Sequence, residues 1–213
     1  MKSQQKIVIF SIIGLILFFM ISGALYKNQK SNDVVAMVKE DSALLERDYS
    51  VSIGNKDAKV HLVEFFDPAC VTCADFHPLV KDIMKKNEGN IRLTLRYAPY
   101  HSGSDYIVKI LEASRKQGKF NETLEMIFKK QLEWEGFSGP NMKVIWPLLS
   151  QIGLNIDQLV KDMKDPKLDD LIAQDLADAK KVGATKTPSY YVNGKPLQQF
   201  GYEQLKELIY SEL

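Results

Sequence analysis

Apolar positions in the first part of the chain form one continuous stretch rather than an alternating pattern. Residues 7–25 are 19 consecutive positions without a charge. At about 1.5 Å per residue, a helix of this length nearly matches the roughly 30 Å hydrocarbon core of a bilayer. The stretch predicts a transmembrane signal anchor at residues 1–26, with a cleaved signal peptide as the alternative. Only six residues precede it, so either interpretation exports the remaining chain to the extracytoplasmic (periplasmic or cell-surface) side of the membrane.

A polar stretch at residues 26–32 follows the apolar one. Residues 33–47 then carry apolar side chains near helical spacing, with charges between them. We therefore expect residues 27–48 to form a linker and a short amphipathic helix. That helix either spaces the main domain from the membrane or packs on the domain.

Short strand patterns and helical patterns take turns from residue 49 to residue 213. In one strand, at 91–97, apolar residues alternate with Arg92, Thr94 and Arg96, which predicts one buried and one exposed face. The order strand, helix, strand, several helices, hairpin and helix predicts an α/β domain at 49–213, with one sheet covered by helices and a helical block inserted at about 103–183. The expected strands are 50–53, 59–66, 91–97, 189–192 and 195–200; the expected helices are 74–86, 142–152, 168–182 and 202–213, with two more between 105 and 132.

The overall composition is that of a globular protein. The chain is 45% hydrophobic and 26% charged, with a formal net charge of +1. A charge this close to zero, without a basic stripe, gives no electrostatic reason to expect a nucleic-acid partner. Transmembrane export would place the domain where disulfides form and persist.

The only two cysteines of the chain, Cys70 and Cys73, stand three positions apart. Asp67-Pro68 breaks the chain between the strand at 59–66 and the following helix, so Cys70 is expected at the start of that helix. Unpaired backbone N–H groups at a helix N-terminus favour an anion such as a thiolate. The spacing and the position together predict a thiol–disulfide redox centre, against the alternative of a permanent local disulfide.

Further candidate residues are less specific. His77 lies four residues after Cys73 on the same predicted helix, where a lone histidine is more often packed or solvated than a ligand. The loop at 97–101 ends in His101, and it either shapes a substrate groove or simply ends the strand. Three large aromatic residues of the helical block are expected in the core or in a groove wall: Trp134, Phe137 and Trp146.

With these features in place, residues 50–213 resemble the DsbA-like branch of the thioredoxin superfamily. The resemblance rests on Glu64-Phe65-Phe66 leading into Cys70-Val71-Thr72-Cys73, on Pro78 five residues after the second cysteine, on the helical block, and on Thr187-Pro188 before the hairpin. The family implies a thioredoxin-like fold, and the apolar N-terminal segment resembles that of membrane-tethered members.

The resemblance implies a role for each matching residue. Cys70 would be the solvent-facing nucleophile and Cys73 the buried resolving cysteine. Pro188 would be cis, and Thr187 would offer its backbone to an extended substrate segment. Glu64 would be a buried carboxylate that relays protons to and from Cys73; an exposed glutamate at a strand edge is the alternative.

Two details qualify the resemblance. Arg92 falls where some members have a basic partner for the buried acid, but a position on a solvated face is the explanation that we favour. Val71 and Thr72 replace the Pro and His of the best-known pattern, so one donor to the Cys70 thiolate is missing. We therefore expect a less acidic Cys70 and a less oxidising centre than in the most oxidising members.

The predicted function is extracytoplasmic thiol–disulfide exchange on protein substrates, without a cofactor or metal. The partners would be proteins with thiols or disulfides and a membrane redox partner that recycles the centre. Whether the enzyme acts as an oxidase, a reductase or an isomerase is not encoded in the motif. One alternative is a membrane-tethered copper chaperone that uses the two thiolates with His77 or His101; another is a redox-inert module that holds substrates.

Overall fold

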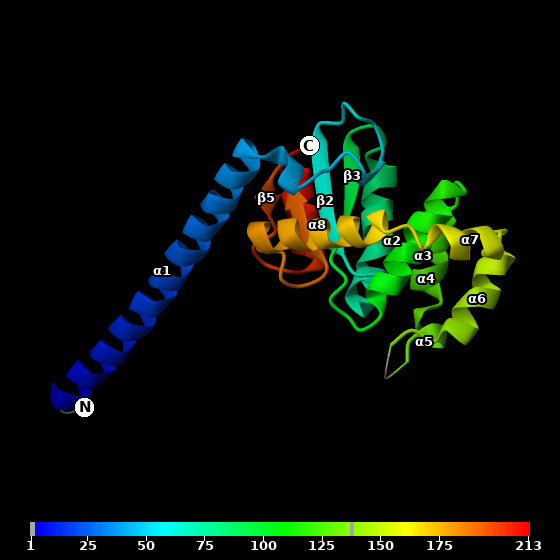
Figure 1. Cartoon of the computed structure of the whole chain (residues 1–213). Helices are drawn as coiled ribbons and strands as arrows, with labels where there is room; N and C mark the ends of the chain where they lie inside the picture. Colours follow the sequence, from blue (N-terminus) through cyan, green and yellow to red (C-terminus); the bar gives the residue numbers. More distant parts are fainter. Residues whose placement is uncertain (1–2, 137–138) are drawn as a thin grey trace.

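The computed structural model describes residues 3–136 and 139–213, with side chains from Ile9 onward (Figure 1). A mixed five-stranded sheet forms the centre of the domain, in the order β1-β3-β2-β4-β5. Strands β2 and β3 are parallel, and the other neighbours are antiparallel. The strands are β1 (Val51–Ile53), β2 (Val60–Phe66), β3 (Ile91–Tyr97), β4 (Ser189–Val192) and β5 (Lys195–Pro196).

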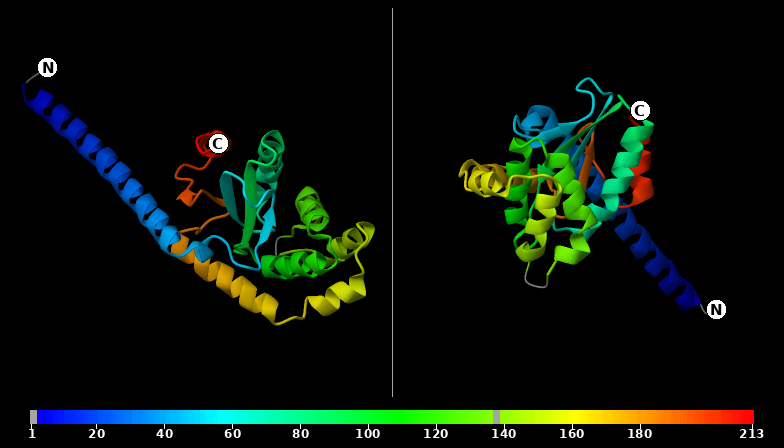
Figure 2. Two further views of the ribbon diagram at one scale, coloured as in Figure 1. Left: turned by 90° about the horizontal axis from the view of Figure 1, so that it is seen from above. Right: turned by 90° about the vertical axis from the view of Figure 1, so that its right-hand side faces the viewer.

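Helices cover both faces of the sheet. In Figure 2, α2 and α9 lie on one face and α8 lies along the opposite face. Between β3 and β4 the chain forms the expected block of helices, packed beside the sheet (Figure 1). The predicted thioredoxin-like α/β fold with an inserted helical block is therefore confirmed. The helices of the domain are α2 (Val71–Lys86), α3 (Ser104–Lys116), α4 (Phe120–Lys129), α5 (Gln131–Trp134), α6 (Met142–Gln151), α7 (Ile156–Asp162), α8 (Lys167–Val182) and α9 (Tyr202–Tyr210).

Strand β2 is buried on both sides, because it lies between β3 and β4 and beneath both helical layers. Leu62 and Phe66 belong to the larger core, whereas Val63 and Phe65 belong to a second cluster on the opposite face. A strand covered on both faces is apolar without alternation. This explains the continuous apolar run before the two cysteines.

The exposed face predicted for β3 is wrong. Thr94 and Arg96 are both 0% exposed, because α8 and the segment between α1 and β1 cover that face. The guanidinium of Arg96 donates to Asp175 at 2.8 Å and to Asp178 at 2.7 Å, both on α8. A buried charge is tolerated only when it is paired and hydrogen-bonded. The two aspartates therefore allow an arginine to occupy a core position.

Several predicted boundaries need correction. Helix α2 begins at Val71 rather than at residue 74, and α9 ends at Tyr210. Strand β5 ends at Pro196 rather than at residue 200, because after one further hydrogen bond from the Leu197 N–H to the Tyr190 carbonyl oxygen the chain bends away from β4. Helix α7 was not predicted. Of the three aromatic residues expected inside, Trp134 is fully buried and Trp146 packs against the core, while Phe137 lies outside the described residues.

The N-terminal helix α1 runs without interruption from Ser3 to Glu40 and projects from the domain (Figure 1). The linker expected at residues 26–32 is helical instead, since this polar stretch has no glycine or proline to end a helix. Val34 is buried against the domain and Val38 packs beside it, so the last part of α1 is docked. Its apolar part is exposed, and α1 is long and apolar enough to cross a membrane.

Candidate active site

The turn between β2 and α2 carries both cysteines. Cys70 is the N-cap residue of α2, with extended backbone angles (φ −84°, ψ 120°), as its position in the sequence predicted. Asp67 shapes the turn: its carbonyl oxygen accepts from the Cys70 N–H at 3.0 Å, and its carboxylate accepts from the Ala69 N–H at 2.8 Å. The turn thereby presents the first thiol to the unpaired N–H groups of the helix.

The two thiols, both free, differ in environment. Cys73 is 0% exposed, whereas Cys70 keeps 6% exposure, less than a solvent-facing thiol was expected to have. A hydrogen bond from the Cys73 thiol lowers the pKa of Cys70 to about 5, against burial, with help from the Thr187 side chain and the backbone N–H groups of Cys73 and Thr72. Burial first, and then the hydrogen bond with Cys70, raise the pKa of Cys73 far above its ordinary value. The arrangement holds one thiolate beside one neutral thiol.

The loop before β4 lies against the first cysteine. The peptide bond between Thr187 and Pro188 is cis, as expected. The Cys70 Sγ lies 3.3 Å from the Thr187 carbonyl oxygen. Strand β4, which pairs with β2, carries this loop back to the active-site turn from 117 residues away. Both halves of the candidate site therefore sit on adjacent strands of one sheet.

Glu64 lies inside the protein, so the exposed alternative is wrong. Its side chain is on β2 opposite Tyr190 of β4, is 2% exposed, and accepts from the Tyr190 hydroxyl at 3.1 Å. Burial raises the pKa of Glu64 to about 8; the Tyr190 bond lowers it, and the negative charge of Cys70 raises it. A carboxyl group with this pKa is largely protonated at neutral pH, and it can both give and take a proton there.

Arg92 does not contact this acid. Its guanidinium donates to Glu46 at 2.6 Å near the surface, so the alternative of a basic partner for Glu64 is wrong. His77 pairs with Glu125 at 3.1 Å on α4, which agrees with a packed histidine. Across residues 3–136 and 139–213, no group of three or more His, Cys, Asp or Glu side chains has the geometry of a metal site.

Sequence reasoning missed the pair formed by Asp67 and His101. The fully buried Asp67 carboxylate accepts from the backbone N–H groups of Tyr100 and His101 and lies 2.8 Å from His101 Nδ1. The bond with Asp67 raises the pKa of His101, and the negative charge of Cys70 adds to the effect. A loop after β3 therefore places an imidazole, whose charged form Asp67 favours, close enough to Cys70 for the two charges to interact. In the sequence, the only sign of this pair was the position of Asp67 directly after a buried strand.

Comparison with known proteins agrees with the thioredoxin-like fold seen in the structure. Residues 46–211 match the family model described as Thioredoxin. A Bacillus anthracis protein named "probable disulfide bond formation protein D" is 26% identical over 231 residues, covering 100% of this chain and 99% of that protein. A Na(+)/H(+) antiporter NhaA of Herminiimonas arsenicoxydans is 29% identical over 147 residues, or 68% of this chain. The chain spans only 22% of that relative's length.

Solved structures share the fold. A thioredoxin-like oxidoreductase from Silicibacter pomeroyi DSS-3 superposes with a TM-score of 0.68 at 28% identity, covering 80% of this chain and 96% of that chain. BdbD from Bacillus subtilis gives a TM-score of 0.65 at 22% identity, covering 76% and 92%. The fold and the cysteine pair at the start of α2 define a thioredoxin-like protein with a candidate thiol–disulfide centre. The chain belongs to the thioredoxin family.

Proposed function

We propose that this protein catalyses thiol–disulfide exchange on protein substrates outside the cytoplasm, with Cys70 as the nucleophile and Cys73 as the resolving cysteine. The observation that carries the proposal is the contrast between the two thiols. The pKa of Cys70 is lowered to about 5 while that of Cys73 is raised, within one turn of α2. A thiolate with so low a pKa is a good leaving group, which favours transfer of the disulfide to a substrate.

In the oxidising direction, a substrate thiolate attacks Cys70 Sγ, and the Cys70–Cys73 bond breaks. Cys73 leaves with the electron pair and takes up a proton, for which the protonated Glu64 is the proposed donor. A second substrate thiolate then attacks the substrate sulfur of the mixed disulfide, and Cys70 leaves as a thiolate. The substrate loses two electrons to form its disulfide, and the cysteine pair gains them. The reductive direction runs through the same mixed disulfide in reverse.

We assign substrate binding to the cis-proline loop and recycling to a partner in the membrane. Thr187 and Pro188 lie beside Cys70, where an extended segment reaches the reactive sulfur. The exposed apolar part of α1 supports membrane tethering, with residues 49–213 as the extracytoplasmic domain. A recycling partner in the same membrane would restore the oxidised or reduced pair.

Trapping mixed disulfides tests the proposal directly. The Cys73→Ala variant, expressed in cells as the full chain, should accumulate mixed disulfides with other proteins, since the resolving thiol is absent. The Cys70→Ala variant is the matched control and should accumulate none. Equal adduct levels in the two variants would contradict the assigned roles. Tight stoichiometric copper binding without exchange activity would instead favour the alternative of a copper chaperone.

A further inference from the structure

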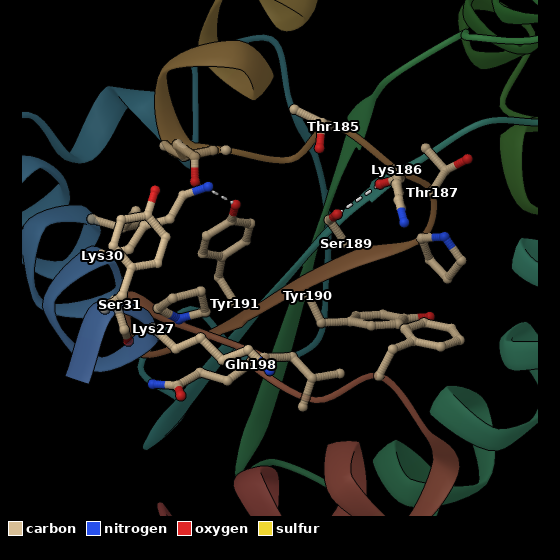
Figure 3. Close-up of a pocket in the computed structure, with 18 of the residues that line it drawn as sticks. Lys27, Lys30, Ser31, Thr185, Lys186, Thr187, Ser189, Tyr190, Tyr191 and Gln198 are labelled. Carbon is tan, nitrogen blue, oxygen red and sulfur yellow. Dashed lines mark hydrogen bonds between the residues drawn. The ribbon is translucent and has the colours of Figure 1, made fainter. Parts of the chain in front are cut away.

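A cavity beside the active site is walled partly by the N-terminal helix. It has a volume of about 720 Å³, within the range of roughly 300–1,000 Å³ typical of binding pockets. One wall is the cis-proline loop with β4, and the opposite wall is the α1 segment from Gly23 to Val34 (Figure 3). Burial of Val34 and the contact of Val38 with the hairpin turn at Gly194 hold this segment in place. The cavity is therefore built from docked elements.

The charges around this cavity have one sign. Lys27 and Lys30, one turn apart on α1, line it together with Lys186 of the cis-proline loop. No acidic side chain is among the described residues that line it, and none of the three lysines forms an ion pair with another described residue. The nearest acid on α1, Asp33, accepts from Gln29 at 2.9 Å. The cavity therefore offers three unneutralised cations to an occupant.

The reactive sulfur lies at the rim of the same cavity. Thr187 lines the cavity, and its carbonyl oxygen is 3.3 Å from the Cys70 Sγ. Thr72, between the two cysteines, lines it as well. A polypeptide segment bound to Cys70 through its own cysteine thus continues into the space between the lysines within a few residues, at about 3.3 Å per extended residue.

We propose that this cavity is a substrate subsite that selects acidic segments beside the reacting cysteine, and that α1 is part of it. The inference rests on the proposed function and adds a substrate class: extended segments rich in Asp or Glu next to a cysteine. Lys27, Lys30 and Lys186 attract the carboxylates, while the Thr187 loop keeps the neighbouring cysteine at Cys70. The anchor helix is then a determinant of specificity as well as a tether.

Binding of redox-inert peptides tests the proposed subsite. Flanking charges would change the reactivity of a peptide thiol, and peptides without a thiol avoid this effect. The full chain is placed in nanodiscs of zwitterionic phosphatidylcholine, and fluorescent peptides carry serine for the cysteine with Asp, Asn or Lys on either side. We expect the Asp peptide to bind about tenfold tighter than the Asn peptide at low salt, since a few exposed charge pairs each contribute a small factor. At about 0.5 M salt the ratio should approach one because the charges are screened.

Charge variants locate the effect. Lys27→Gln with Lys30→Gln should lower the Asp-to-Asn ratio to about twofold or less. Lys27→Glu with Lys30→Glu should reverse the preference towards the Lys peptide, a result that misfolding does not mimic. The matched control, Lys39→Gln with Lys181→Gln, removes the same charge from exposed positions of α1 and α8 outside the cavity, and it should keep the wild-type ratio.

Three outcomes would overturn the inference: equal binding of all three peptides by the wild type, an acidic preference that survives the Lys27 and Lys30 changes, or its loss in nanodiscs of anionic phosphatidylglycerol. The last result would mean that lipid headgroups occupy the lysines. A parallel exchange assay with cysteine peptides separates this failure from that of the proposed function. Exchange without charge preference contradicts the subsite alone, whereas absence of exchange with every peptide contradicts the proposed function.

Discussion

Removal of the Cys73 thiol should raise the pKa of Cys70, because that thiol is the main hydrogen-bond donor to the thiolate. A hydrogen bond to a charged group contributes about 1.5–3 kcal/mol, and a thiol is a weak donor, so the lower end applies. Since one pKa unit equals about 1.4 kcal/mol, Cys73→Ala should move the Cys70 pKa from about 5 to about 6. Cys73→Ser keeps a donor in the same place and should stay near the wild type.

The pH dependence of alkylation measures this shift. In either variant Cys70 is the single cysteine, so the rate of its reaction with iodoacetamide reports one thiolate. The full chain, kept in detergent, is alkylated across the pH range from 4 to 9, and the adduct is quantified by mass spectrometry. Equal midpoints for the Ala and Ser variants would refute the role of the Cys73 thiol. A wild-type midpoint near the ordinary thiol value of about 8.5 would refute the whole account of the site's electrostatics.

Three further changes probe the surroundings of the cysteine pair. Glu64→Gln should slow resolution of the mixed disulfide at least about tenfold and remove a rise in that rate near pH 8, measured by stopped-flow mixing. Asp175→Ala should lower the free energy of unfolding by about 3–5 kcal/mol in chemical denaturation, because it leaves a buried arginine half-paired, whereas Lys181→Ala on the same helix should change it by about 0.5 kcal/mol or less. Asp67→Asn should lower the pKa of His101 towards its ordinary value in an NMR titration. Because the folded pKa of His101 is raised, the ion pair stabilises the protein at low pH, and the stability difference from the wild type should shrink as pH rises through that value.

Much of the fold was predictable because its determinants are local. The strand β3 from Ile91 to Tyr97 was predicted at its observed bounds from alternating apolar residues, and the strand β4 from Ser189 to Val192 from its place before the Asn193-Gly194 turn. The cysteine turn was predictable for the same reason, since a strand, a break and a helix follow one another directly. Polar character alone misled at residues 26–32, where the absence of glycine and proline lets α1 continue.

The buried ion pairs were not predictable from any local pattern. Arg96 reads as an exposed position in an alternating strand, yet its partners Asp175 and Asp178 lie 79 and 82 residues further along the chain. Arg47 also donates to Asp178, at 2.7 Å, so the segment after α1 is tied to the same cluster. The alternation of a single strand cannot reveal that a distant helix supplies two carboxylates. A charge at an apparently exposed position therefore carries little information about burial in a sheet covered on both faces.

The pKa of Cys70 also depends on residues that are distant in the sequence. The residues between the cysteines lack an imidazole, which predicts a less acidic thiol, and a pKa of about 5 is above the roughly 3.5 of the most acidic relatives. Part of the stabilisation of the thiolate comes from elsewhere in the chain, because the Thr187 side chain donates from the cis-proline loop. The charge of Cys70 in turn raises the pKa of His101, which Asp67 holds in the loop after β3. The thiolate is therefore a property of three segments brought together by adjacent strands. Its redox behaviour depends as much on those loops as on Val71 and Thr72 in the motif itself.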